Sequence, residues 1–288
     1  MIMEVRNLSF QYHNSRTIFS DVNFDIDQGE VLSIIGINGA GKSTLLNCLA
    51  ALFSPKTGEI FLEGKPLKNM SRPDIAKVIG YVPQTHNAIY AFTVLEFVVM
   101  GRTPHIGFLS SPSKADYKIA DEALEKMHIS HLRDKAYTEI SGGERQLALI
   151  ARVIAQQPKL ILLDEPTSHL DFGNQYRTVE LIKELSDMGF AVIMTTHMPD
   201  HAIILDGKVG VLDRNGHLAV GAASEIMTDC NLSDLYGINV KTKFITEADR
   251  AVCVICPTEN NTDCCFDKIC AMANDAKNNK TREEDYDV

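Results

Sequence analysis

Hydrophobic residues along the chain change spacing repeatedly, and the order of these changes predicts an α/β protein. Short, almost continuous apolar runs occupy residues 31–35, 159–163 and 190–195. Such runs are typical of strands that are buried on both faces of a parallel sheet. Helical patterns follow at residues 144–157, which end before a proline, and at residues 178–187. We therefore expect a buried, mainly parallel sheet whose strands are connected by helices.

The same pattern predicts two further parts of the fold. Residues 4–10 and 17–26 alternate between apolar and polar side chains, which is typical of antiparallel strands. A helical pattern covers about residues 94–135, interrupted by a polar segment with proline and glycine at 101–113. Shorter strands are expected at residues 59–62 and 78–84, and a terminal hairpin at 208–212 with 217–220. The expected architecture combines the parallel core with an N-terminal antiparallel β subdomain and an inserted helical subdomain.

A glycine-rich loop stands between the first apolar strand and the helical pattern that begins near Thr44. It reads Gly-Ile-Asn-Gly-Ala-Gly-Lys-Ser over residues 36–43, which is the P-loop pattern in its strand–loop–helix context. The glycines let successive backbone N–H groups face one anion, at the positive end of the following helix. An ordinary glycine-rich turn is the alternative, but Lys42 and Ser43 stand in register for the β- and γ-phosphates and for Mg²⁺. We expect a P-loop NTPase core whose nucleotide-binding residues are Asn38, Gly39, Gly41, Lys42, Ser43 and Thr44.

Two carboxylates end the apolar strand at residues 159–163. Asp164 and Glu165 should lie at the carboxyl edge of the sheet, where α/β folds bind ligands. Asp164 is expected to hold Mg²⁺ and Glu165 to orient and deprotonate an attacking water. The alternative is a helix-capping acid followed by a solvated one, because Pro166 starts a turn here.

A second phosphate-receptive helix start is expected at Ser141-Gly142-Gly143-Glu144. By itself this sequence is a capping box, in which Ser141 caps the helix and Glu144 bonds back to it. The same helix terminus is also an anion site. A chain with two such sites must bind two anions or share one ATP between two copies, and the second option implies a dimer with nucleotide at the interface.

These motifs resemble, in content and in order, those of the nucleotide-binding subunit of an ABC transporter, over about residues 1–240 with a helical insertion at about 86–150. The resemblance implies ATP hydrolysis and assigns an adenine-stacking aromatic, the P-loop, the Q-loop, the LSGGQ motif, the Walker B pair, the D-loop and the H-loop. These fall on Tyr12, residues 36–44, Gln84, residues 140–146, Asp164 with Glu165, residues 168–171 and His197.

The resemblance also implies roles that the residues alone leave open. Gln84 would contact Mg²⁺ and water, although it could be a plain surface amide. His197 would bond the γ-phosphate, although a lone histidine is more often a core residue with one backbone bond. Tyr12 would stack on adenine rather than only pack. Ser141 and Gly143 would contact the ATP of the second copy; Glu144 stands where the family usually has glutamine, and leaves both in place.

Charge and composition limit the partners. The net charge of −10 argues against nucleic acid as a partner. No apolar run approaches the roughly 18–20 residues that cross a bilayer, and the N-terminus lacks the layout of a secretory signal. Any role at a membrane is therefore expected to depend on a partner. The resemblance implies that multi-span permease subunits hold the protein at the cytoplasmic face of the membrane, that the second ATPase subunit is an identical copy, and that an extracytoplasmic substrate-binding protein is an indirect partner.

The cargo and the family subgroup rest on resemblance. Residues 94–108 and 164–175 are similar to prokaryotic importers of ferric siderophores, haem and cobalamin, and molybdate or tungstate importers are the alternative. ABC ATPases that act in DNA repair, chromosome organisation or translation form a second alternative. They carry coiled coils, zinc insertions or a second cassette that this sequence lacks. A soluble P-loop kinase would not need Ser141, Gly143 or His197.

A short extension over residues 241–288 carries a cysteine cluster and an acidic tail. Five of the seven cysteines lie in it, at positions 253, 256, 264, 265 and 270. Their spacing matches no standard zinc or iron–sulfur ligand set, and residues 251–256 have the pattern of a strand. Apolar packing is therefore the expected role of these cysteines, with metal binding as the alternative.

Overall fold

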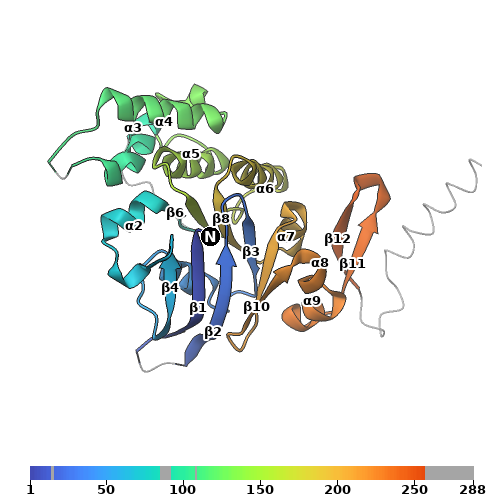
Figure 1. The fold of residues 1–288 in the computed structure, drawn as a ribbon. Coiled ribbons are helices and arrows are strands. Elements are labelled where there is room, and N and C mark those ends of the chain that lie inside the picture. The colour runs from blue at the N-terminus through green and yellow to red at the C-terminus, as the bar shows by residue number, and fades with distance from the viewer. Residues whose placement is uncertain (14–15, 85–91, 108, 257–288) are drawn as a thin grey trace, which may run out of the picture.

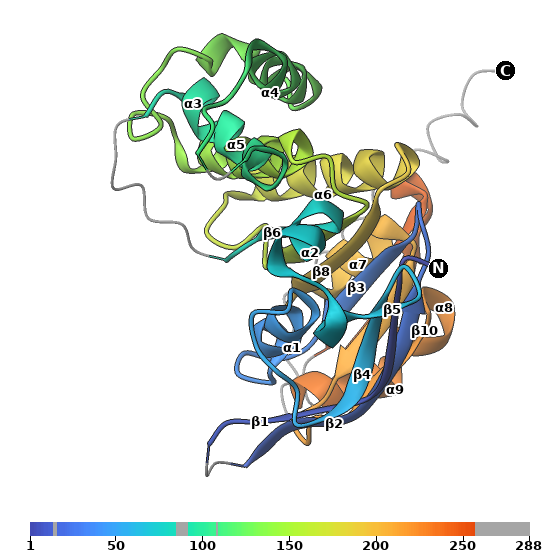
Figure 2. The same ribbon diagram turned by 60° about the vertical axis from the view of Figure 1, so that its left-hand side comes forward.

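The computed structural model describes residues 1–13, 16–84, 92–107 and 109–256. In this part of the chain a mixed sheet and an antiparallel sheet pack face to face, and α3, α4 and α5 gather in a separate layer (Figures 1 and 2). The last described elements, α9 and the hairpin of β11 and β12, lie beside α7 on the other side of the molecule (Figure 1). This arrangement confirms the expected α/β class with a helical subdomain and an N-terminal antiparallel subdomain.

The central sheet has six strands in the order β10-β9-β3-β8-β7-β6. Every neighbouring pair from β9 to β6 is parallel, and only β10 runs antiparallel to its neighbour. The carboxyl ends of β3, β8, β7 and β6 therefore meet at one edge. Their bounds are β3 Val31–Ile35, β6 Ile79–Val82, β7 Leu160–Asp164, β8 Ala191–Thr196, β9 Lys208–Leu212 and β10 Leu218–Ala222.

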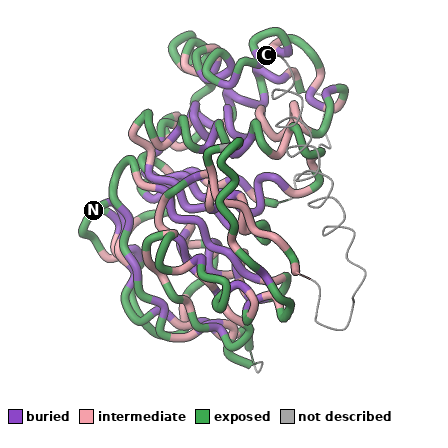
Figure 3. Tube along the Cα trace, turned by 90° about the vertical axis from the view of Figure 1, so that its right-hand side faces the viewer, coloured by how far each residue is buried: buried purple, intermediate pink, exposed green. Residues whose placement is uncertain are grey.

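The apolar strands of this sheet are hydrophobic throughout because each faces two cores. In β7, Ile161 and Leu163 pack among the helices of the helical layer, whereas Leu160 and Leu162 pack toward the antiparallel sheet. The period-two alternation of a strand is thus preserved, but both of its faces are dry. Figure 3 shows the buried trace running through the sheets and on into the helices above them.

The antiparallel sheet has the order β2-β1-β4-β5 and covers one face of the central sheet. Its strands are β1 Met3–Gln11, β2 Thr17–Ile26, β4 Thr57–Leu62 and β5 Lys65–Pro66. The turn between β4 and β5 contains Glu63 and Gly64, both with positive φ. Gly58 is required where β4 passes β1, because a Cβ there would lie 2.4 Å from the carbonyl oxygen of Asn7.

The helices divide between the sheet and the helical layer. Those that pack on the sheet or its edge are α1 Lys42–Leu49, α2 Arg72–Val78, α6 Phe172–Asp187, α7 Pro199–Leu205, α8 Ala223–Ile226 and α9 Asp229–Tyr236. The helical layer contains α3 Val94–Val99, α4 Lys114–Lys126 and α5 Gly142–Ala155, with short 3₁₀ helices at Met100–His105 and Ser130–Leu132. A further 3₁₀ turn at Leu67–Asn69 precedes α2, and another at Thr246–Ala248 connects β11 Val240–Ile245 to β12 Arg250–Ile255.

Buried apolar contacts and a buried cation hold the helical layer together. The rings of Phe97 in α3 and Tyr137 stack with centroids 4.0 Å apart, and the Arg152 guanidinium of α5 lies 4.8 Å from the Phe97 centroid. Arg102 is buried and bonds Asp116 of α4 together with the Ala155 carbonyl at the end of α5. The three helices are thereby fixed relative to one another. No helix of the described residues is long and apolar enough to span a membrane.

Most of the expected strands are confirmed, and the differences concern helices and the strand β11, which was not expected. The interruption expected at residues 101–113 is partly wrong, because Met100–His105 continue α3 as a 3₁₀ helix in spite of Pro104. The helix expected at 178–187 begins six residues earlier, at Phe172, where Asp171 caps it. Helices α2, α7, α8 and α9 were not expected. They are short, with four to eight residues each, so their periodic signal is weak.

Adding one methyl group at Gly101 should separate α3 from α5. A Cβ at this position would lie 2.0 Å from the carbonyl oxygen of Arg152, which is helix backbone and cannot move alone. We expect Gly101→Ala to lower the free energy of unfolding by about 1–3 kcal/mol, measured by urea denaturation. Gly173→Ala in α6 is the control, because its Cβ would meet only a carboxylate oxygen of Asp171 at 3.6 Å and should cost nothing. Equal stability of the two variants would contradict this packing.

Candidate nucleotide-binding site

The glycine-rich loop curls between the end of β3 and the start of α1. Gly39 and Gly41 have φ of +80° and +107°, and Gly41 caps α1 in the left-handed conformation. A Cβ on Gly41 would lie 2.5 Å from a methyl carbon of Ile18. The buried Lys42 donates its ammonium hydrogens to the carbonyl oxygens of Gly36 and Ile37, at 2.8 and 3.2 Å. The loop therefore has the backbone that wraps a phosphate, with a cation inside it.

A cavity of about 360 Å³ opens above this loop. The described residues that line it are Tyr12, Ile18, Asn38, Gly39, Gly41, Lys42, Ser43, Thr44, Gln84 and Glu165. The structure thus brings together all the P-loop residues expected from the sequence, along with Gln84 and Glu165. Ile18 is an additional wall that sequence reasoning missed.

Tyr12 lies at the rim of the cavity, half-exposed. Its hydroxyl is 3.1 Å from that of Thr44, and its ring stands edge-on to Phe10 with the centroids 4.9 Å apart. Phe53 approaches it from a third side. The tyrosine ring is therefore held at the mouth of the phosphate loop, where a flat base could stack against it.

Asp164 ends β7 and is surrounded by hydroxyl groups. It accepts hydrogen bonds from Ser43 Oγ at 3.0 Å and from Thr195 Oγ1 at 2.7 Å, and Tyr81 OH lies 3.5 Å from its other oxygen. Burial, followed by the charge of Asp164, raises the pKa of Tyr81, so its hydroxyl stays protonated. The carboxylate is thus fixed beside the P-loop serine.

Glu165 gathers three of the other expected residues around one carboxylate. Its Oε1 lies 3.2 Å from Lys42 Nζ, and its Oε2 accepts from Gln84 Nε2 at 3.0 Å and lies 3.4 Å from His197 Nδ1. Glu165 has φ of +46°, a left-handed conformation that is strained for a residue with a side chain. Thr195 Oγ1 accepts its N–H, and Ser168 donates to its carbonyl oxygen through both N–H and hydroxyl. Those bonds maintain the strained backbone.

The residues around Asp164 suit Mg²⁺ and not a softer metal. A serine hydroxyl, an aspartate carboxylate and a nearby glutamine amide are hard oxygen donors, which leave positions open for phosphate and water. Among the described residues, no group of three or more His, Cys, Asp or Glu side chains could hold a metal ion. Cys253 and Cys256 are therefore not part of such a group among the described residues. Cys264, Cys265 and Cys270 lie outside the described residues.

Ser141 and Gly143 stand apart from the cavity, at the start of α5. The expected capping box is present: Ser141 Oγ accepts the N–H of Glu144, whose carboxylate accepts the N–H of Ser141 at 2.7 Å. Hydrogen bonding of its carboxylate to the backbone N–H of Ser141, and then to the Ser141 side chain, lowers the pKa of Glu144. Neither Ser141 nor Gly143 is among the described residues that line the P-loop cavity. Figure 2 shows α5 in the helical layer and α1 below it, so one copy does not bring its two phosphate-receptive helix starts together.

Sequence reasoning missed three polar residues that support the site: Thr195, Tyr81 and His201. Thr195 faces Asp164 because β7 and β8 pair in that register, and no local pattern reports a register. His201 is buried, with Nδ1 3.4 Å from Thr167 Oγ1 and 3.3 Å from Thr196 Oγ1. It therefore joins the segment after Glu165 to the segment before His197.

The fold and this loop define a P-loop protein that binds a nucleoside triphosphate. Residues 19–168 match the ABC transporter family model. An uncharacterised ABC transporter ATP-binding protein of Haemophilus influenzae is 40% identical over 236 residues, 82% of this chain and 89% of that protein. The molybdate import ATP-binding protein MolC of the same species is 37% identical over 235 residues, 81% and 87% of the two chains. The petrobactin import ATP-binding protein FpuC of Bacillus anthracis is 36% identical over 235 residues, 81% and 86% of the two chains.

Solved structures agree with these relatives. A metal-chelate type ABC transporter in an inward-facing conformation superposes with a TM-score of 0.80 and 34% identity, over 90% of this chain and 98% of that one. A dimeric ATP-binding cassette with ADP and phosphate bound gives 0.67 and 27%, over 77% and 99% of the two chains. This chain belongs to the ABC transporter ATP-binding family, whose members hydrolyse ATP. The resemblance inferred from the motifs is confirmed.

The buried His201 should make stability depend on pH. Burial lowers the pKa of His201, with the charge of Asp200 opposing and that of His197 adding to the effect. The folded state then binds the proton more weakly than the unfolded state, whose histidine has the ordinary value of 6.5. The contribution to stability is complete above that pH and is lost as the pH falls below it, with a slope of at most about 1.4 kcal/mol per unit.

We expect His201→Gln to flatten the fall in stability between pH of about 6.5 and 5, measured by urea denaturation at several pH values. His217→Gln, at an exposed site, should retain the wild-type slope. An unchanged slope in His201→Gln would show that other groups carry the pH dependence.

Proposed function

We propose that two copies of this chain close on ATP and hydrolyse it at sites completed by both. The observation that carries the proposal is the set of contacts around Glu165, where a buried carboxylate meets Lys42, Gln84 and His197 at 3.0–3.4 Å. Lys42 supplies a cation for phosphate and Glu165 a base for water. Gln84 and His197 are polar groups beside that base. Such a set suits phosphoryl transfer to water, in which positioning and charge stabilisation do most of the work.

Each side chain has a distinct role in this reaction. Lys42 and the N–H groups of the loop from Asn38 to Thr44 bind the β- and γ-phosphates. Glu165 accepts the proton of the attacking water while Gln84 orients that water. His197 bonds the γ-phosphate. Tyr12 stacks on adenine at the rim, and Ser43, Gln84 and Asp164 hold Mg²⁺, which neutralises charge on the phosphates when it is bound.

The second copy supplies what the cavity of one copy lacks. Ser141 and Gly143 begin α5, a helix of 14 residues with its N–H groups and positive dipole end exposed. Placed against the γ-phosphate of the opposite copy, they make closure depend on a charge that hydrolysis removes. The dimeric cassette among the solved structures supports this arrangement. Two identical subunits are the simplest form of it.

A groove between α2 and the helical layer is the proposed docking surface for the permease. It has a volume of about 740 Å³ and is lined mainly by α2, α3, the 3₁₀ helix after α3 and the start of α4. Phe92, Met100 and Tyr117 line it and are 41%, 39% and 37% exposed. A short apolar segment of a permease would cover these side chains. Through it the chain would be held at the cytoplasmic face of the membrane.

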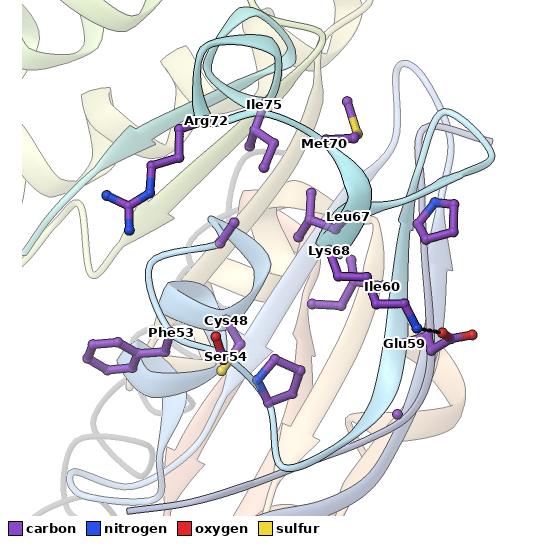
Figure 4. Close-up of a pocket in the computed structure, with 14 residues that line it drawn as sticks. Cys48, Phe53, Ser54, Glu59, Ile60, Leu67, Lys68, Met70, Arg72 and Ile75 are labelled. Carbon is purple, nitrogen blue, oxygen red and sulfur yellow. Dashed lines mark hydrogen bonds and ion pairs between the residues drawn. The ribbon is translucent and has the colours of Figure 1, made fainter.

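A separate, smaller pocket of about 240 Å³ lies nearer α1 and shares Arg72 with this groove. Figure 4 shows Leu67, Ile75 and Cys48 around it, with Arg72 at its border, and Arg72 also lines the larger groove. Cys48 packs here as an apolar group, and burial raises its pKa to about 12. The two hollows together form a docking surface that reaches from the helical layer to the P-loop helix.

The direction of transport and the cargo are proposed from the similarity to the relatives. We propose import of an iron chelate, haem or cobalamin-like molecule, with capture by an extracytoplasmic binding protein. The petrobactin importer and the metal-chelate transporter support this cargo class, and the molybdate importer keeps molybdate or tungstate as the alternative.

Glu165→Gln should trap ATP in a closed dimer. Glutamine keeps the shape but cannot accept the proton of water, so hydrolysis should fall about 10²-fold or more while binding remains. Size-exclusion chromatography with Mg·ATP should show a dimer for this variant and a monomer for the control Lys42→Ala, which loses the phosphate-binding cation. Undiminished turnover in Glu165→Gln would refute its role as base, and a monomer at saturating Mg·ATP would refute the shared site.

Met100→Asp should prevent permease binding by placing a charge in the apolar groove. The measurement is co-purification with co-expressed permease subunits. The control is Leu109→Asp, because Leu109 is 95% exposed and does not line the groove. Retention of the permease by Met100→Asp would place the docking surface elsewhere. Uptake of labelled ferric siderophore, haem, cobalamin, molybdate and tungstate by the assembled transporter then distinguishes the cargo classes.

A further inference from the structure

The C-terminal elements contact the loop that carries His197. The hydroxyl of Tyr236, the last residue of α9, donates a hydrogen bond to the main-chain carbonyl oxygen of His197, with the two oxygens 2.9 Å apart. Burial raises the pKa of Tyr236, and the nearby Cys253 and Asp200 add to the effect. The hydroxyl therefore stays protonated, and able to donate, near neutral pH.

A second contact attaches the same elements to the helix that follows His197. The N–H of Cys253 in β12 donates to Asp200 Oδ1 in the first turn of α7, at 2.8 Å. The Arg250 guanidinium of β12 also lies 6.0 Å from the ring centroid of Tyr176 in α6. The hairpin of β11 and β12 is thus attached to α6 and α7. Helix α6 follows the segment with Asp164 and Glu165, and α7 follows His197.

These contacts matter because the histidine side chain has little support of its own. His197 follows the last residue of β8, and α7 begins two residues later at Pro199. Its side chain is 43% exposed, and its Nδ1 lies 3.4 Å from Glu165 Oε2. The N–H of Met198 donates to Thr196 Oγ1 at 3.0 Å, which holds one side of the peptide that joins His197 to Met198. The Tyr236 hydroxyl holds the carbonyl oxygen of the same peptide, so both polar groups of the bond that follows His197 are fixed.

We propose that Tyr236 is a positioning residue for His197, and that the C-terminal elements α9, β11 and β12 thereby influence the rate of ATP hydrolysis. Tyr236 does not touch the nucleotide; it acts through the backbone of the histidine. This inference depends on the proposed role of His197 at the γ-phosphate. It gives the elements after α8 a function in the catalytic cycle rather than only in folding.

The test is the kinetics of Tyr236→Phe in the full chain, which removes one hydroxyl and leaves the ring. We expect kcat to fall about three- to tenfold, as loss of one well-placed hydrogen bond can cause, with the KM for ATP changed less than about twofold. Ser233→Ala is the matched control. It removes the bonds between Ser233 Oγ and the backbone of Val240, which attach α9 to β11 without touching His197. It should leave kcat unchanged.

A double-mutant cycle separates positioning from a general loss of structure. In a His197→Ala background, Tyr236→Phe should have no further effect on the residual rate, because the group that it positions is absent. Asp200→Ala releases the other contact to α7 and should show the same pattern, which keeps the test valid if Tyr236→Phe is poorly folded. The same fold reduction with and without His197 would overturn the inference, and so would a normal kcat in Tyr236→Phe.

The failure of this inference differs from the failure of the proposed role of His197. If His197→Ala itself turns over at the wild-type rate, the role of His197 is wrong and the inference falls with it. If His197→Ala is slow but Tyr236→Phe is normal, only the positioning role is wrong. A shift of the His197 ring resonance in Tyr236→Phe, observed with ¹³C-labelled histidine and identified by its absence in His197→Ala, would support positioning directly.

Discussion

The site depends on keeping the carboxylate of Glu165 buried and paired. It is joined to Lys42, and both side chains are at least 90% buried. Removing one member of such a pair leaves an uncompensated buried charge, which typically costs several kcal/mol. In the proposed reaction, the γ-phosphate would bind the same Lys42 ammonium that the carboxylate contacts. Binding of ATP would then displace Glu165 from Lys42 and make its carboxylate available to water. Nucleotide binding and activation of the proposed base would thus be one exchange of partners at a single cation.

Sheet topology makes that exchange possible. The order β3-β8-β7-β6 places four strand ends side by side, and each contributes one member of the site: Lys42 after β3, His197 after β8, Glu165 after β7 and Gln84 after β6. These residues are separated by as many as 155 positions in sequence, from Lys42 to His197. The rigid ladder of a buried parallel sheet holds them within hydrogen-bond reach of one carboxylate. The strained backbone at Glu165 is tolerated because Thr195 and Ser168 satisfy its N–H and carbonyl groups.

Sequence reasoning succeeded where the signal is local and failed where it depends on register. The P-loop could be predicted because its glycines, Lys42 and Ser43 stand in one run, and the buried strands because continuous apolar runs of that length have few alternatives. Thr195, Tyr81 and His201 could not, since each acts on a residue in another strand or segment through a pairing that no local pattern encodes. Tyr236, at the end of the short helix α9, is likewise distant in sequence from its partner His197. The capping box at Ser141 was recognisable because both of its members lie within one helical turn.

One copy of the chain does not bring Ser141 and Gly143 to the P-loop, and the packing of its two parts explains why. Ser141 and Gly143 are fixed within the helical layer, whose core is continuous with one face of the central sheet, whereas the P-loop helix packs on the opposite face. A shift within one chain would have to break the bonds from Arg102 to α4 and α5 or the bonds from Gln156 to the backbone beside β6. A second copy avoids that cost, because it can present its own α5 to the cavity as a rigid body. Closure of two rigid copies on a charged nucleotide therefore breaks fewer contacts within the chain than a rearrangement inside one copy would.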